Sequence, residues 1–238
     1  MSSSTDTNAE APLRGFLLAL PEALLRGCRY LPFGSQIPLP GGVITVQSMA
    51  SDGEELFTEL AASREPFVMT LEEFDEEEGD EGARDGNHGV IGIASTHTTD
   101  EELGVTTTEI LGVGRVHIER LYLLSEEEAL PRADVTPVVA TSEGEEIETI
   151  QAALELLVDN FLEPLEHANA DFVRVLRHFT RAHDDPSLNI DRVANILVEH
   201  QPPLLHAFIS QPSMLARLAI LQEEMHRIHE RLLAHINN

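Results

Sequence analysis

The histidines that most suggest a metal site lie near the end of the chain, where Glu223, His226, His229 and Glu230 occur close together. Imidazole and carboxylate groups are common zinc ligands, and one helix would place these four on neighbouring faces. The two histidines are three residues apart, however, which differs from the H-E-x-x-H pattern of zinc hydrolases. We therefore predict a solvated helix face here and keep a metal-dependent hydrolase as an alternative.

The other candidates for chemistry are scattered along the chain. His178 with His183, and His200 with His206, flank expected helix ends, which indicates capping or surface groups. Cys28 has no neighbouring histidine, and no serine lies in a G-x-S-x-G pattern, so an activated nucleophile is not indicated. The sequence predicts no catalytic residue, no cofactor site and no metal site.

Arg115 lies inside an expected strand, in the run ILGVGRVHIERL. A strand position favours a structural role over a role in a mobile binding loop. We interpret Arg115 as the partner of a carboxylate within the expected β unit, with a ligand clamp as the alternative.

Charge is the strongest feature of the composition. The 238 residues include 42 acidic and 15 basic side chains, a net charge of −27, and every basic one is arginine. Such a surface repels phosphate backbones and anionic lipid, which argues against nucleic acid and membrane as partners. The bias fits either life in high salt or drift in a GC-rich genome, and it names no function.

Cysteine content and hydropathy limit the cellular compartments in which the chain is expected. A single cysteine excludes an internal disulfide and a cysteine-based metal cluster, which fits a reducing compartment. No apolar run reaches the roughly 20 residues of a membrane-spanning helix, and no signal peptide is recognised near the start. We expect a soluble, cytoplasmic protein.

The first half of the chain has the pattern of a β unit with little helix. Residues 1–10 are expected to be disordered and a short amphipathic helix to follow at Leu13–Leu25. A second helix is expected in DGEELFTELAAS, followed by strands in PFVMTL, VIGIAST, VTTTEILGVGRVHIERLYLL and ADVTPVVAT. The segment Glu72–Gly89 is acidic, glycine-rich and almost free of apolar residues, which predicts a solvated loop, and its acidic residues lack the spacing of an EF-hand calcium site.

After Gly144 the apolar period changes to three and four residues, which predicts helices. The expected helices lie in ETIQAALELLVDNFLEPL, ADFVRVLRHFTRAH, IDRVANILVEH and PSMLARLAILQEEMHRIHERLLAHI. The last one carries a heptad seam of Leu218, Leu221, Met225, Ile228 and Leu232. This seam either packs onto the preceding helices or is exposed to a partner.

Several motifs follow one another in the order found in a known family. In LPFGSQIPLPGGVITV, Leu31 and Pro32 match an opening motif that leads through an apolar strand to a turn at Pro40 and Gly41, and Val43 and Ile44 match a returning strand. IGIAST and ILGVGRVHIERL resemble two further strand motifs, and DDPSLNIDRVANILVEHQP resembles a helical one. Over roughly residues 30–236 the chain thus resembles the amino-terminal, substrate-binding domain of Lon proteases.

This resemblance implies an α+β fold in which a PUA-like antiparallel β barrel precedes a helical bundle with a long terminal helix. The expected divisions are residues 1–29 as a tail with a short helix, 30–142 as the barrel and 145–238 as the bundle. The chain has no G-x-x-x-x-G-K-[ST] phosphate loop and no lysine, so it lacks the ATPase and Ser-Lys protease modules of Lon.

The resemblance therefore implies a stand-alone, non-enzymatic protein-binding module. Its expected partners are unfolded or exposed apolar polypeptide segments, or a protease or chaperone, and the chain itself is expected to be a monomer or weak homodimer. A PUA-like nucleic-acid-binding protein is the alternative from another class, because PUA-like barrels often bind RNA.

Overall fold

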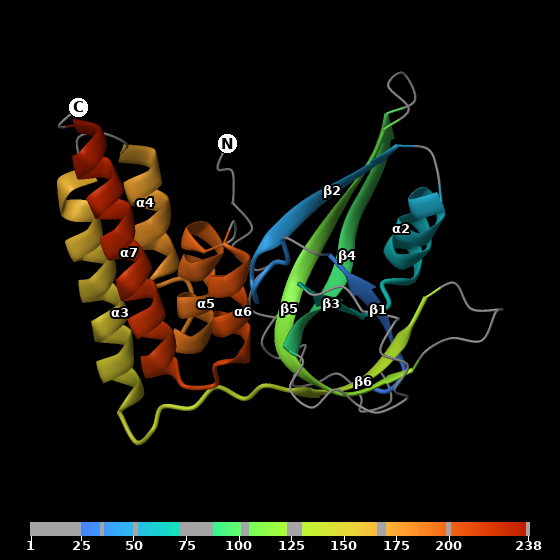
Figure 1. Cartoon of the computed structure of the whole chain (residues 1–238), viewed down its shortest axis with the longest axis horizontal. Helices are drawn as coiled ribbons and strands as arrows, with labels where there is room; N and C mark the ends of the chain where they lie inside the picture. Colours follow the sequence, from blue (N-terminus) through green and yellow to red (C-terminus); the bar gives the residue numbers. More distant parts are fainter. Residues whose placement is uncertain are drawn as a thin grey trace, which may run out of the picture.

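The computed structural model describes residues 25–33, 36–49, 52–71, 88–100, 105–122, 130–165, 170–198 and 201–236. Nearly all of the helix expected at Leu13–Leu25, and most of the Glu72–Gly89 loop, lie outside these residues. Within them the fold is α+β: a six-stranded sheet with one helix precedes a group of five helices that lies on the other side of the sheet (Figure 1). In this part of the chain no helix is long and apolar enough to cross a membrane.

The sheet consists of strands whose order is β2-β5-β4-β3-β1-β6. Their bounds are β1 Cys28–Pro32, β2 Val43–Met49, β3 Phe67–Thr70, β4 His88–Asp100, β5 Val105–Tyr122 and β6 Arg132–Pro137. The long strand β5 also pairs with β6, so β5, β4, β3, β1 and β6 form a ring of paired strands to which β2 is added. All of the strands expected after residue 66 are present.

The stretch between β1 and β2 differs from the sequence-based expectation. We expected an apolar strand ahead of the turn, but Ile37 and Leu39 are buried without belonging to a strand. Pro38 lies between them and cannot donate to a ladder, which accounts for the difference. The turn at Pro40 and Gly41 is present, and Gly41 adopts a φ of +78°, a conformation that favours glycine.

The helices follow the apolar periodicity, with one addition. Helix α2 is Asp52–Ser63, and the second half contains α3 Ile147–Leu162, the 3-10 turn η3 Glu163–Leu165, α4 Ala170–Phe179, α5 Pro186–Leu197, α6 Pro202–Ser210 and α7 Met214–Ile236. Helix α5 begins four residues earlier than the expected segment, because Asp185 caps it by accepting a hydrogen bond from the Ser187 amide at 3.1 Å. Helix α6 was not predicted.

One apolar core is shared by the sheet and the helices. It joins residues of the opening stretch, such as Ile37 and Leu39, to residues of the helices, such as Ile190 and Phe208. A second, smaller core gathers buried residues of the paired strands around Val68. On α7 the seam packs inward, with Leu218, Leu221 and Met225 exposed by only 8%, 0% and 3%, whereas Leu232 is 39% exposed.

Candidate functional site

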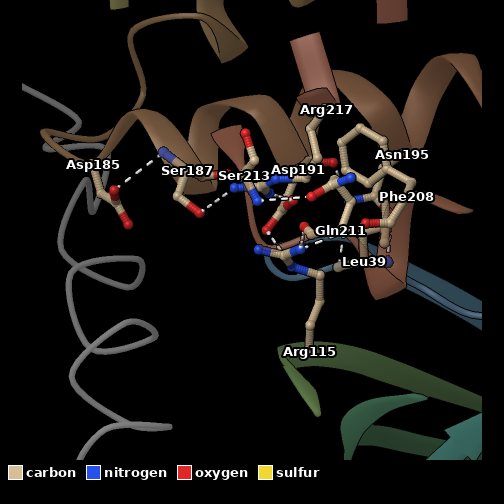
Figure 2. Close-up of polar contacts among 10 residues, drawn as sticks. All are labelled: Leu39, Arg115, Asp185, Ser187, Asp191, Asn195, Phe208, Gln211, Ser213 and Arg217. Carbon is tan, nitrogen blue, oxygen red and sulfur yellow. Dashed lines mark hydrogen bonds and ion pairs between the residues drawn. The ribbon is translucent and has the colours of Figure 1, made fainter. Parts of the chain in front are cut away.

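A group of buried charged side chains lies where the sheet meets the helices (Figure 2). Arg115 projects from β5, Asp191 from α5 and Arg217 from α7, and their exposed fractions are 3%, 3% and 0%. The alternation of β5 and the apolar stripe of each helix turn these three positions toward the shared core. We call this group of three side chains the junction cluster.

Asp191 is the centre of the junction cluster. Its carboxylate accepts a hydrogen bond from Arg217, and its other oxygen lies 3.7 Å from Nε of Arg115. Arg217 also donates to Oγ of Ser187 at 2.8 Å, and its guanidinium lies 5.6 Å from the ring centroid of Phe208. The three elements β5, α5 and α7 are thereby held together by a single carboxylate.

Arg115 also binds backbone carbonyls at the end of α6. Its Nη1 donates to the oxygen of Gln211 at 2.6 Å and lies 3.5 Å from that of Phe208. Burial is the largest influence on this guanidinium and lowers its pKa to about 10, while Asp191 acts in the opposite direction. Arg115 therefore stays charged at neutral pH and cannot act as a general base there.

This geometry corrects our interpretation of Arg115. We expected its partner to be a carboxylate of the β unit, but the partner is Asp191 on a helix. Arg115 thus connects the two halves of the fold instead of stabilising one of them. The arrangement of two guanidiniums around one carboxylate suits a structural joint more than acid-base chemistry, because each charge is already engaged.

Asn195 makes a second polar connection between α5 and the opening stretch. Its Oδ1 accepts a hydrogen bond from the amide of Leu39 at 2.8 Å, and its Nδ2 donates to the carbonyl of Leu39 at 3.3 Å. A Cβ added to Gly42 would lie 2.3 Å from the same side chain. Asn195 therefore satisfies the backbone of a residue that has no strand neighbour, which explains how Leu39 can be buried without a ladder.

The histidines and glutamates on α7 do not come together as a metal site. Glu223 pairs with Arg227, and His226 lies 3.4 Å from Glu230 at the surface. His229 instead stacks on Phe161, with centroids 4.9 Å apart, and its Nε2 lies 2.8 Å from the Phe161 carbonyl oxygen. In the described part of the chain no three histidine, cysteine or acidic side chains are arranged to hold a metal ion.

The remaining histidine candidates are separated as well. His178 lies in the last turn of α4, His183 lies in the turn before α5, and His206 lies on α6. The backbone amide of His183 donates to Asn189 at 3.0 Å. His200 is outside the described residues.

Cys28 is a buried core residue of β1, only 3% exposed. Burial raises the pKa of its thiol to about 11, and the nearby carboxylates of Glu65 and Asp134 raise it further. A thiol with so high a pKa is a poor nucleophile at neutral pH.

Comparison with known proteins identifies the architecture. No protein-family model matches the sequence, and no curated protein matches it significantly. The structure does match the N-terminal domain of the Lon protease of the Mycobacterium avium complex, with a TM-score of 0.62 and 18% identity over 84% of this chain and 98% of the other. The chain has the fold of a Lon N-terminal domain.

A second solved structure agrees with this assignment. The Lon N-terminal domain protein from Xanthomonas campestris matches with a TM-score of 0.53 and 14% identity, over 82% of this chain and 96% of the other. Both matches span most of each chain, so the Lon-like fold includes the sheet and the helices that the junction cluster connects.

Proposed function

We propose that the chain is a non-enzymatic protein-binding module that holds apolar segments of unfolded polypeptide or docks on a protease or chaperone. The observation that carries the proposal is the likeness in fold to two Lon N-terminal domains over nearly their whole length. Binding would depend on burial of apolar area, at roughly 25 cal/mol per Å².

The burial and the contacts of the junction cluster and of Cys28 support the non-enzymatic part of the proposal. The charges of the junction cluster are engaged with one another and with backbone carbonyls. The only thiol is buried and has a raised pKa. These are the properties of groups that hold a structure together, since catalytic groups need access to substrate.

The same proposal includes the finer architecture. The ring of paired strands corresponds to a PUA-like barrel within residues 30–142, and residues 145–238 form the bundle. The single cysteine supports a cytoplasmic location, and the net charge of −27 supports a monomeric or weakly dimeric protein that binds neither nucleic acid nor membrane.

Fluorescently labelled casein, a largely unfolded polypeptide, tests the proposal directly. We expect its fluorescence anisotropy to rise saturably with added protein. Folded globular proteins of about the same size as casein should compete poorly for binding. The titration is repeated at about 0.5 M salt, because screening should preserve apolar binding while weakening purely ionic contacts. An unchanged anisotropy at both salt concentrations would overturn the proposal.

Two activity assays test the non-enzymatic part separately. The purified protein should hydrolyse neither ATP nor casein. Turnover of either that is abolished by a point substitution in this chain would show that the protein is an enzyme.

A further inference from the structure

Strand β2 forms one margin of the sheet. It runs over Val43–Met49 and its only ladder within the described residues is the antiparallel one with β5 (Figure 1). The other five strands of the sheet, β5, β4, β3, β1 and β6, form a closed ring of pairings. The outer side of β2 is therefore an edge to which a further strand can be added.

The register shows which backbone groups point outward along this edge. The amide of Gly112 donates to the carbonyl of Gly42 at 2.9 Å and its carbonyl accepts from the amide of Gly41 at 2.9 Å, so both backbone groups of Gly112 face this end of β2, as in a hydrogen-bonded pair. Because such pairs alternate in an antiparallel ladder, Ile44 and Val46 bond to β5, and the N–H and C=O groups of Val43, Thr45 and Gln47 point away from it. No backbone hydrogen bond joins these outward groups to another described residue.

Between Val43 and Met49, β2 has no charge, no proline and no register shift against β5, so it lacks the features that usually protect an edge strand. Edges are commonly protected by charged side chains, proline, a bulge or short length. The strand VITVQSM is seven residues long and contains no charge and no proline, in a chain with 42 acidic residues. Its first four residues, Val43–Val46, also have high β propensity.

We propose that the outer edge of β2 binds an extended segment of a client polypeptide as an added β-strand. This inference rests on the proposed function and specifies its mode of recognition. Main-chain hydrogen bonds from Val43, Thr45 and Gln47 recognise the backbone of the client, so they accept clients of different sequence.

The side chains beside the edge define the chemistry of the occupant. Val43 is 53% exposed, and it lies in one cross-strand row with the half-buried Leu111 and Ile93. An added strand extends this row, so a β-branched or apolar side chain of the client packs on Val43. A second copy of the chain is disfavoured as occupant, because two bodies of charge −27 repel each other. The occupant is a neutral or basic, proline-free segment.

Proline substitutions on the outward positions test the edge. The probe is a fluorescently labelled peptide in which valine alternates with threonine, with lysines at both ends. Thr45→Pro and Gln47→Pro each remove one outward N–H, and proline is tolerated at edge positions whose N–H faces solvent. Thr45→Ala and Gln47→Ala remove the side chains but keep the N–H, so they are matched controls.

We expect each proline variant to raise the Kd of the peptide by roughly threefold to tenfold, the effect of one main-chain hydrogen bond, and each alanine variant to change it by less than about twofold. A second measurement needs no variant: a peptide with the same side chains, N-methylated throughout its central residues, should lose most of its affinity for the unaltered protein. This second peptide keeps the test valid if a proline variant fails to fold.

The outcomes separate this inference from the function on which it rests. Equal affinity for the N-methylated and the unmodified peptide, or binding of casein without binding of the peptide, overturns the edge and leaves the proposed function standing. Loss of binding to both casein and peptide overturns the function as well. A dimer that Gln47→Pro dissociates would show that a second copy occupies the edge, which overturns the choice of occupant.

Discussion

The guanidinium of Arg115 on β5 lies 3.7 Å from the carboxylate of Asp191 on α5, and both side chains are almost fully buried. Asp191 also accepts a hydrogen bond from Arg217 on α7. One carboxylate thus balances two arginines from two other elements. The sheet and the helices are expected to unfold as one cooperative unit, because separating them would leave these charges unpaired.

Asp191→Asn tests this joint, because it removes the charge and keeps the shape of the side chain. It leaves two buried guanidiniums without a counter-charge, and we expect the free energy of unfolding to fall by about 3–5 kcal/mol. Urea denaturation followed by circular dichroism measures the change.

Asp171→Asn is the matched control. Asp171 forms a surface ion pair with Arg174, and the two side chains are 85% and 79% exposed. Such pairs contribute at most about 1 kcal/mol, so the free energy of unfolding should barely change. Equal effects of the two substitutions would show that the junction cluster does not connect the two halves.

Most of the helices and strands could be predicted from the sequence, whereas the junction cluster could not. Periodicity located the strands and most helices because it reflects local burial. Asp191 and Arg217 lie within apolar helical segments, and that placement was the available signal for a buried ion pair. Their partners are far away in the sequence, so no local pattern could show which charges meet.

Two other differences have local physical causes. Helix α6 was missed because its short sequence begins with Pro202 and Pro203, which also mark turns, and proline is tolerated in the first turn of a helix. The strand expected ahead of the turn at Pro40 and Gly41 does not form because Pro38 cannot donate to a ladder, and Asn195, a residue 156 positions away, satisfies the Leu39 backbone instead. Pro40 was thus interpreted correctly as a turn residue, whereas Pro202 and Pro203 were interpreted wrongly as a joint between helices, because they begin a helix.

Gly112 should not tolerate a side chain. A Cβ added there would lie 2.5 Å from the carbonyl oxygens of Pro38 and Leu39, and backbone atoms cannot move aside as a flexible side chain can. We expect Gly112→Ala to lower the free energy of unfolding by about 1–3 kcal/mol. Val43→Ala, at a 53% exposed position on the same strand pair, should change it by about 0.5 kcal/mol or less. Comparable urea midpoints for Gly112→Ala and the parent protein would contradict the close approach.

The thiol of Cys28 should react very slowly in the folded protein. With a pKa raised to about 11, only roughly one thiol in a thousand is ionised at pH 8, and the side chain is buried as well. Mass spectrometry after iodoacetamide treatment should show unmodified protein in buffer and a single adduct in concentrated urea. Rapid alkylation in buffer would mean that β1 opens readily.

Salt should stabilise the fold. A net charge of −27 causes self-repulsion that destabilises the compact state, and added ions screen it. We expect the melting temperature to rise between dilute buffer and about 0.5 M sodium chloride, by about 2–4 °C for each kcal/mol gained. Potassium chloride should give the same rise, because screening depends on ionic strength. A flat or falling curve would show that carboxylate repulsion is not the dominant long-range term.

The seam of α7 should contribute to stability through inward packing. Leu221 is fully buried, and Ile228 packs against the same core. Replacing both by aspartate buries unpaired charges, and we expect the free energy of unfolding to fall by several kcal/mol. Leu232→Asp is the control, because a residue that is 39% exposed can keep its new charge hydrated. Thermal melts and light scattering are measured together. If the double variant keeps its melting temperature and only changes from dimer to monomer, the seam is an interface between copies, and the packing seen here does not stabilise the single chain.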